Sequence, residues 1–307
     1  MWLMYAILAA VSFGMRGISY HWTSQQGFDR NLLLCGVFAM GAVVNLIAAI
    51  ATGSAWNAAS LVGIQMGLFS FGGNAGMFKG FAVGKASLVA ILTALPSVVV
   101  VIVAFLLWGE KLHTMQLIAF LIIIGGVLLV RYSNELSLRN LQGAQWGLLA
   151  MLMFAFNDLS GKWSTMIGAE LFPSMFFLFT TGTACFGLWW LFDLRKSRMQ
   201  TEELAAASEI SAPPASTNQP VVRKSRARLR TFLVGMAVGT TNTVGMFFII
   251  TAFDLGKAGL VSAVAALNVI IILIYTRFVV KESFSRTELT GIILAFAGIV
   301  VMRLFGT

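Results

Sequence analysis

The sequence predicts an all-α membrane protein with ten transmembrane helices in two inverted five-helix repeats. Composition is the first reason, because the 307-residue chain is 58% hydrophobic and only 11% charged, with a mean hydropathy of +0.87. Soluble domains are about 25% charged. The length of the apolar runs is the second reason, since about 20 residues with few charges can cross roughly 30 Å of hydrocarbon as a helix. The third reason is an internal repeat that divides the chain into two halves.

Ten apolar runs meet this length requirement. They cover residues 2–20, 31–51, 58–80, 86–108, 114–131, 145–164, 172–192, 230–252, 258–280 and 286–304. A transmembrane β-barrel would need alternating segments of about ten residues, which the sequence lacks. We therefore expect ten helical spans.

The longer part of the repeat aligns residues 61–131 with residues 233–303 without a gap. Its polar matches are Lys85 with Lys257, Glu110 with Glu282, and Arg131 with Arg303. Apolar composition alone would match some Leu, Val and Ala, but not the Gly, Lys, Glu and Arg positions together. Duplicated membrane halves are typical of transporters that open to either side of the membrane.

A shorter part of the repeat aligns the first span of each half, residues 8–22 with residues 149–163. The change of register between the two alignments requires extra residues between the seventh and eighth spans. Each half then holds five spans, and an odd number turns the second half upside down relative to the first. The domains that follow are a first repeat over 1–132, a second over 143–192 and 230–305, and a linker over 193–229.

The net charge of +9 is concentrated in segment 193–229, where two basic clusters flank a polar stretch rich in Pro and Ser. Such a composition predicts a disordered linker. Its basic ends are expected to hold the loop in the cytoplasm and to contact anionic lipid headgroups. Membrane lipids, and not nucleic acid, are therefore the expected partners. The same charge rule places both termini outside the plasma membrane.

The stretch LTALPSVVVVIVAFLLWGEKLHTMQLIAFLIIIGGVLLV at 92–130 carries a mid-helix Pro, a Glu just past the helix end, and then a Gly-containing helix. In this pattern it resembles the EamA-type domain of the drug/metabolite transporter superfamily. The positions concerned are Pro96, Glu110 and Gly126 in the first half, and Glu282 and Gly298 in the second, where Asn268 replaces the Pro.

The resemblance implies an alternating-access carrier for small organic solutes, in a family whose members carry amino acids, sugars, nucleotide-linked metabolites or cationic drugs. Members are often described with cytoplasmic termini, which is opposite to the charge count. We expect a multi-pass permease of the plasma membrane that exports a small metabolite and acts as a monomer. The alternative is a flippase for a lipid-linked substrate. An enzyme is not expected, since no catalytic cluster, cofactor motif or metal-ligand spacing is found.

Polar residues inside the spans are the candidate binding residues, because polar groups in hydrocarbon normally face a bundle interior or a watery cavity. Asp158 is the deepest carboxylate, and Lys162 lies one turn later on the same helix face, where an ion pair could form. Asn157 is adjacent, and the repeat aligns it with Arg16. We hypothesise that Arg16 and Asp158 form a charge pair in a cavity. The alternative is that Arg16 and Lys162 extend to lipid headgroups.

A second polar surface is expected on the third and eighth spans, from Ser70, Asn74 and Asn242. An unpaired amide in lipid is costly, so these side chains should face inward, to bind substrate or to bond between helices. Glycines of these spans, among them Gly67 and Gly239, are expected to permit close helix packing.

Two further pairs of aligned positions have expected roles at helix interruptions and ends. Pro96 can kink its span as a gate or simply pack, and Asn268 at the aligned position could bond backbone or ligand. Glu110 and Glu282 are expected to cap a helix or pair at the membrane interface, and not to bind cargo.

Overall fold

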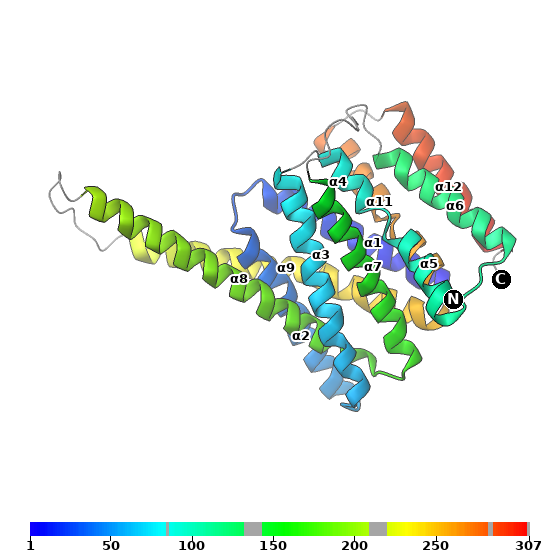
Figure 1. Ribbon diagram of the computed structural model, residues 1–307, viewed down its shortest axis with the longest axis horizontal. Helices are drawn as coiled ribbons and strands as arrows, with labels where there is room; N and C mark the ends of the chain where they lie inside the picture. The colour runs from blue at the N-terminus through cyan, green and yellow to red at the C-terminus, as the bar shows by residue number, and fades with distance from the viewer. Residues whose placement is uncertain (84–85, 132–142, 209–219, 282–284, 306–307) are drawn as a thin grey trace.

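The computed structural model describes residues 1–83, 86–131, 143–208, 220–281 and 285–305 (Figure 1). The predicted all-α class is confirmed, because the described residues form helices joined by short connections and contain no strand. The helices are α1 (Trp2–Ser24), α2 (Arg30–Thr52), η1 (Ala58–Leu61), α3 (Val62–Val83), α4 (Ala86–Leu92), α5 (Pro96–Trp108), α6 (Thr114–Arg131), α7 (Ala144–Met166), α8 (Leu171–Ser208), α9 (Pro220–Leu255), α10 (Ala258–Ala265), α11 (Asn268–Tyr275), η2 (Thr276–Val280) and α12 (Arg286–Phe305).

Seven stretches of the described chain are long and apolar enough to cross a membrane. They lie in α1, α2, α4–α5, α8, α9, α10 through η2, and α12. Of the three remaining predicted spans, α6 is a shorter apolar helix. The other two, α3 and α7, carry Ser, Asn, Gln, Asp and Lys side chains that lower their hydropathy. The multi-pass character is therefore established by seven helices, and ten spans remain a prediction.

Glycines bring helices of the two halves into backbone contact, as expected. A Cβ on Gly67 of α3 would meet the Leu178 carbonyl oxygen of α8 at 2.5 Å. A Cβ on Gly239 of α9 would overlap the Val37 carbonyl oxygen of α2. The repeat aligns Gly67 with Gly239 and Val37 with Leu178, so aligned residues make the same contact twice.

The fourth and ninth spans are interrupted helices. The chain leaves the helix at 93–95 and Pro96 starts α5, so the expected distortion of this span takes the form of an interruption. A role of Pro96 as a gate stays a prediction. Proline lacks the N–H that a helix interior needs, but its fixed φ suits the first helical turn. The ninth span is likewise interrupted after α10, and α11 starts at Asn268, the residue aligned with Pro96.

The predicted disorder of the linker over 193–229 is not seen in its described parts, which are helical. The helix α8 continues to Ser208, and α9 already begins at Pro220. These stretches are rich in Ala, Glu, Leu, Lys and Arg, which are strong helix formers, and they prolong helices that the membrane spans have already nucleated. Residues 209–219 lie outside the described part of the chain.

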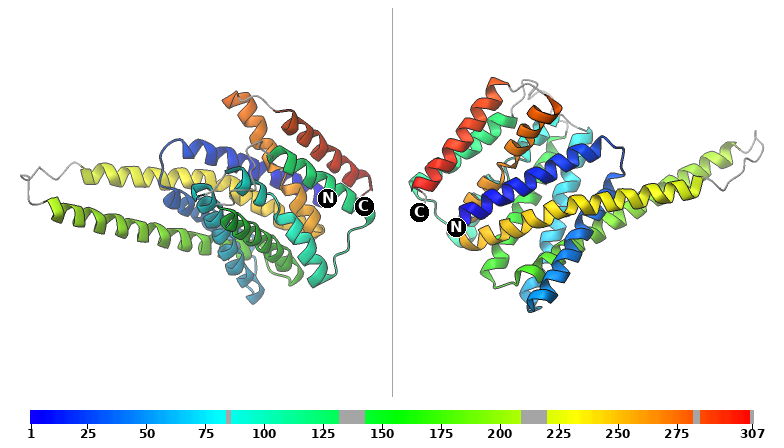
Figure 2. Two further views of the ribbon diagram at one scale, coloured as in Figure 1. Left: turned by 45° about the horizontal axis from the view of Figure 1, so that its top comes forward. Right: turned by 180° about the vertical axis from the view of Figure 1, so that it is seen from behind.

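The two long helices run side by side out of the bundle (Figure 2). We call this end of the bundle the hairpin end. The opposite end, where α1 starts and α12 ends, we call the terminal end (Figure 1). The connections α5–α6, α7–α8 and α9–α10 also lie at the terminal end, because each helix or interrupted span crosses the bundle once.

Candidate functional site

A cavity of about 280 Å³ lies among the helices in the middle of the bundle. Helices of both halves line it, together with the two helix interruptions at 93–95 and 266–267. The predicted residues among its lining are Arg16, Ser70, Asn74, Pro96, Asn157, Asp158, Asn242 and Asn268. Lys162 is not among them. Polar side chains placed inside apolar helices thus converge on one cavity, as the cost of exposing them to lipid requires.

The positive charge of the cavity comes from Arg16 of α1. Its Nη1 donates to Asn242 Oδ1 of α9 at 2.5 Å, and its guanidinium carbon lies 4.7 Å from the centre of the Phe13 ring and 5.8 Å from that of Tyr20. Asn242 is 3% exposed, so this amide is fixed inside the bundle. A guanidinium has five N–H donors. Donors beyond the one bonded to Asn242 can therefore hold a carboxylate or phosphate group of a ligand.

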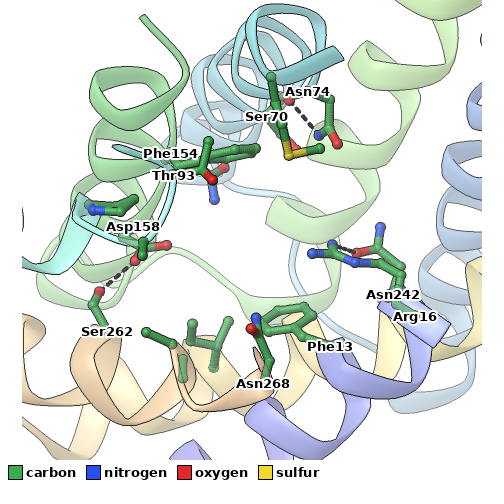
Figure 3. A pocket seen from close by; sticks show the side chains of 18 of the residues that line it. Phe13, Arg16, Ser70, Asn74, Thr93, Phe154, Asp158, Asn242, Ser262 and Asn268 are labelled. Atoms are coloured by element: carbon green, nitrogen blue, oxygen red, sulfur yellow. Dashed lines mark hydrogen bonds between the residues drawn. The ribbon is translucent and has the colours of Figure 1, made fainter. Parts of the chain in front are cut away.

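The negative charge of the cavity comes from Asp158 of α7. Its Oδ2 accepts a hydrogen bond from Ser262 Oγ of α10 at 2.5 Å. Figure 3 shows Asp158 and Ser262 on the wall opposite Arg16 and Asn242. The expected pair between Arg16 and Asp158 is therefore wrong, because each charge is held by a neutral side chain on its own side of the cavity.

Amide side chains line the cavity wall between the two charges (Figure 3). Asn74 Nδ2 donates to the backbone oxygen of Ser70 in the same helix at 2.8 Å, so this amide bonds locally while it lines the cavity. Asn268 stands at the start of α11 on another part of the wall. These side chains offer donors and acceptors to a ligand in several directions.

Two buried polar atoms on the cavity wall lack a hydrogen-bond partner within the described part of the chain. They are Asn157 Oδ1 and Ser97 Oγ, the latter in the first turn of α5. A buried polar atom without a partner costs free energy, so it calls for a partner outside the protein, such as a ligand or water. Both atoms therefore mark positions where a substrate can bond.

Lys162 points away from the cavity and pairs elsewhere. Its Nζ lies 3.7 Å from Glu110 Oε1, so the expected i,i+4 pair with Asp158 is wrong. Glu110 does pair and cap at a helix end, as expected. Its aligned residue, Glu282, lies outside the described residues, and the expectation for it stays a prediction.

Ser262 and Ser97 are site residues that the sequence reasoning missed, because a serine inside an apolar helix is unremarkable by itself. A usable signal was present in the repeat. Ser262 aligns with Ala90 and Ser97 with Val269, so each is a polar residue whose counterpart is apolar. Asn268, which aligns with Pro96, shows the same kind of mismatch.

The cavity extends toward the hairpin end. Its lining includes Tyr20, Phe81 and Ile272, in the halves of α1, α3 and α11 that approach that end. At the other end it stops in mid-bundle, because α5 contributes only its first turn, Pro96 and Ser97. The structure therefore presents a central site that is closed toward the terminal end.

Comparisons with known proteins agree with this architecture. Residues 1–132 match the EamA-like transporter family, so the resemblance seen in the sequence is confirmed over that part of the chain. Among solved structures 28 chains match. One crystal structure aligns with 99% of this chain and 97% of its own at 13% identity and a TM-score of 0.71, a likeness of fold alone. A comparison with curated proteins finds no match.

Proposed function

We propose that the whole chain, whose residues 1–132 match the EamA-like transporter family, is an alternating-access secondary carrier. It has ten spans in two inverted five-helix repeats and moves a small organic metabolite across the cytoplasmic membrane. The single observation that carries this proposal is the cavity between two interrupted helices, with one cation and one anion on opposite walls (Figure 3). Transporters place their sites near the membrane midplane, at broken helices between repeats.

The glycine contacts support the inverted arrangement. Besides the matched contacts of Gly67 and Gly239, a Cβ on Gly73 would meet the Phe154 ring at 2.6 Å, and one on Gly245 would meet the Phe13 ring at 2.5 Å. The repeat aligns Gly73 with Gly245 and Phe13 with Phe154. Corresponding residues thus pack alike in both halves, as a pseudo-two-fold axis requires.

The charges of the cavity indicate the chemistry of the substrate. Arg16 suits a carboxylate or phosphate, while Asp158 suits an ammonium group. Phe13 and Phe154 line the space near them and suit an apolar body. The best-fitting substrate is therefore a small molecule that carries both charges and an apolar part, with further polar groups directed to Asn157 and Ser97.

The proposed direction of transport is export. The basic residues that flank the α8–α9 hairpin favour the cytoplasm for the hairpin end. The cavity extends toward that end, so a cytoplasmic solute could load into the state described here.

Ligand binding and transport test this function in two steps. Purified protein is first screened by thermal shift against a metabolite library, because a ligand that binds the native state stabilises it. Each ligand that raises Tm is then assayed for saturable transport in proteoliposomes. We expect zwitterionic ligands among those that bind and are transported. The proposal would be contradicted if ligands bind but the wild-type protein transports none of them.

A further inference from the structure

Polar side chains tie three segments together at the terminal end. Lys162 Nζ of α7 lies 3.7 Å from Glu110 Oε1 and donates to the carbonyl oxygens of Phe253 at 2.7 Å and Gly256 at 2.9 Å. Glu110 Oε2 accepts from the backbone N–H of Ala258, the first residue of α10, at 2.9 Å. The turn between α9 and α10 is thus held both by α7 and by the connection between α5 and α6.

A second lysine adds to this attachment. Lys257 Nζ donates to the carbonyl oxygen of Lys111 at 2.5 Å and to Gln116 Oε1 at 2.8 Å. Just inside, a Cβ on Gly259 of α10 would overlap the Val101 side chain of α5. The helices α5 and α10 therefore also contact each other on the side of the polar contacts that faces the middle of the bundle. We call Glu110, Lys162 and Lys257 the terminal-end lock.

The two ends of the bundle differ in this respect. The helices α5 and α10 pack against each other at the terminal end. The repeat aligns α10 with α4 and α5 with α11, but α4 and α11 make no comparable contact among the described residues. The cavity reaches toward the hairpin end and stops short of the terminal end. Contact between α5 and α10 therefore accompanies closure of the terminal end.

The contacts of the lock are suited to repeated breaking. The Lys162 and Glu110 side chains are 13% and 17% exposed, so water can replace their partners when the helices separate. An ion pair of this intermediate burial stabilises the closed state more than an exposed pair would, and breaking it costs less than breaking a fully buried pair. A movement of α10 away from α5 would break the bonds of Glu110 to Ala258 and of Lys257 to Lys111. It would also draw Lys162 away from either Glu110 or the α9–α10 turn.

We propose that the terminal-end lock holds the carrier closed at this end and that it must break for the cavity to open there. This inference rests on the proposed alternating-access function. It assigns to Glu110, Lys162 and Lys257 a role in the conformational equilibrium and not in substrate binding. Weakening the lock should therefore favour the state that is open at the terminal end.

Cysteine accessibility tests the proposal without a substrate. Val101→Cys is introduced where Cys35 and Cys185 are replaced by Ser, and a membrane-impermeant maleimide is added at the terminal end. We expect Glu110→Gln and Lys162→Gln each to raise the labelling rate of this cysteine several-fold. The matched control is Glu170→Gln, which removes an exposed carboxylate from the α7–α8 connection at the same end. Labelling rates in the folded lock variants equal to that of the control would overturn the proposal. If one lock variant fails to fold, the other decides.

A reversible cross-link tests whether the end must open. A Cβ on Gly259 lies 3.1 Å from Val101 Cβ, near the usual separation of about 3.8 Å in a disulfide. Oxidised Val101→Cys/Gly259→Cys protein should stop transporting, and reduction should restore transport. Equal rates in both redox states would overturn the proposal. A wild-type protein that transports nothing would instead contradict the proposed function, which the labelling rates do not measure.

Discussion

Arg16 and Asp158 occupy opposite walls of one cavity, and each is held by a neutral side chain from another helix, Arg16 by Asn242 and Asp158 by Ser262. Both charges thus remain available to a ligand, because neither neutralises the other. A direct pair between them would have filled the centre of the cavity and left a substrate only neutral groups. The separation of the charges gives the site a polarity that a zwitterionic molecule matches.

Replacing Asp158 with Asn should reduce transport at least tenfold, because the amide keeps the shape of the side chain but cannot hold an ammonium group by charge. The measurement is the initial rate in proteoliposomes at matched protein amounts. The control is Asp254→Asn, which changes an exposed carboxylate of α9. Wild-type transport by a normally expressed Asp158→Asn protein would contradict this prediction.

Replacing Arg16 with Lys should weaken substrate affinity by about tenfold, or roughly 1.4 kcal/mol. Lysine keeps the charge but loses the planar fork that binds carboxylates with two parallel bonds. The ligand concentration that gives half of the maximal thermal shift measures this loss. Arg303→Lys, an exposed arginine in the last turn of α12, serves as the control and should leave the affinity unchanged.

Replacing Ser262 with Ala should lower transport about tenfold, and less than Asp158→Asn does, because one hydrogen bond to a charged group contributes at least about 1.5 kcal/mol, which is a little over tenfold in rate. The carboxylate remains but loses its orientation. Rates for this variant and for Ser19→Ala, whose hydroxyl is exposed on α1, should be measured together. A variant as fast as Ser19→Ala would show that Ser262 does not position Asp158.

Replacing Gly126 with Ala should destabilise the packing of α6 on α12 by about 1–3 kcal/mol, since overpacking forces the backbones apart. The added Cβ would meet the Ala295 nitrogen at 2.6 Å and the Gly291 oxygen at 2.7 Å. Thermal unfolding in detergent measures the loss. The neighbouring Gly125→Ala is a matched control, because its Cβ would meet only Leu294 Cδ2 at 3.7 Å. Equal melting temperatures for the two variants would contradict the close packing.

Most of the fold could be predicted from the sequence, because long apolar runs and aligned Gly, Glu and Lys positions depend on spacing alone. That Arg16, Asp158 and Asn242 gather in one cavity could also be predicted, since lipid excludes polar groups. Their partners could not be predicted. The choice between Asp158 and Glu110 as the partner of Lys162 depends on how α7 is rotated against the α9–α10 turn. The spacing of residues along one helix gives no information about that rotation.

The helix interruptions and the long hairpin show a second limit. Pro96 predicted a distortion of its span, but not that α5 would begin there. Near Asn268 the chain leaves the helix without a proline, and no local residue predicts this interruption. Beyond residue 193, polar composition indicated disorder, whereas a helix that is already nucleated continues through strong helix formers at little cost.

Substrate counterflow is the measurement that tests the central claim most directly. Proteoliposomes containing the purified protein are loaded with an unlabelled ligand found by thermal shift, and labelled ligand is added outside. The account predicts transient accumulation of label with wild-type protein and none with Asp158→Asn. Accumulation that is equal in both proteins would show that the cavity between Arg16 and Asp158 is not the transport site.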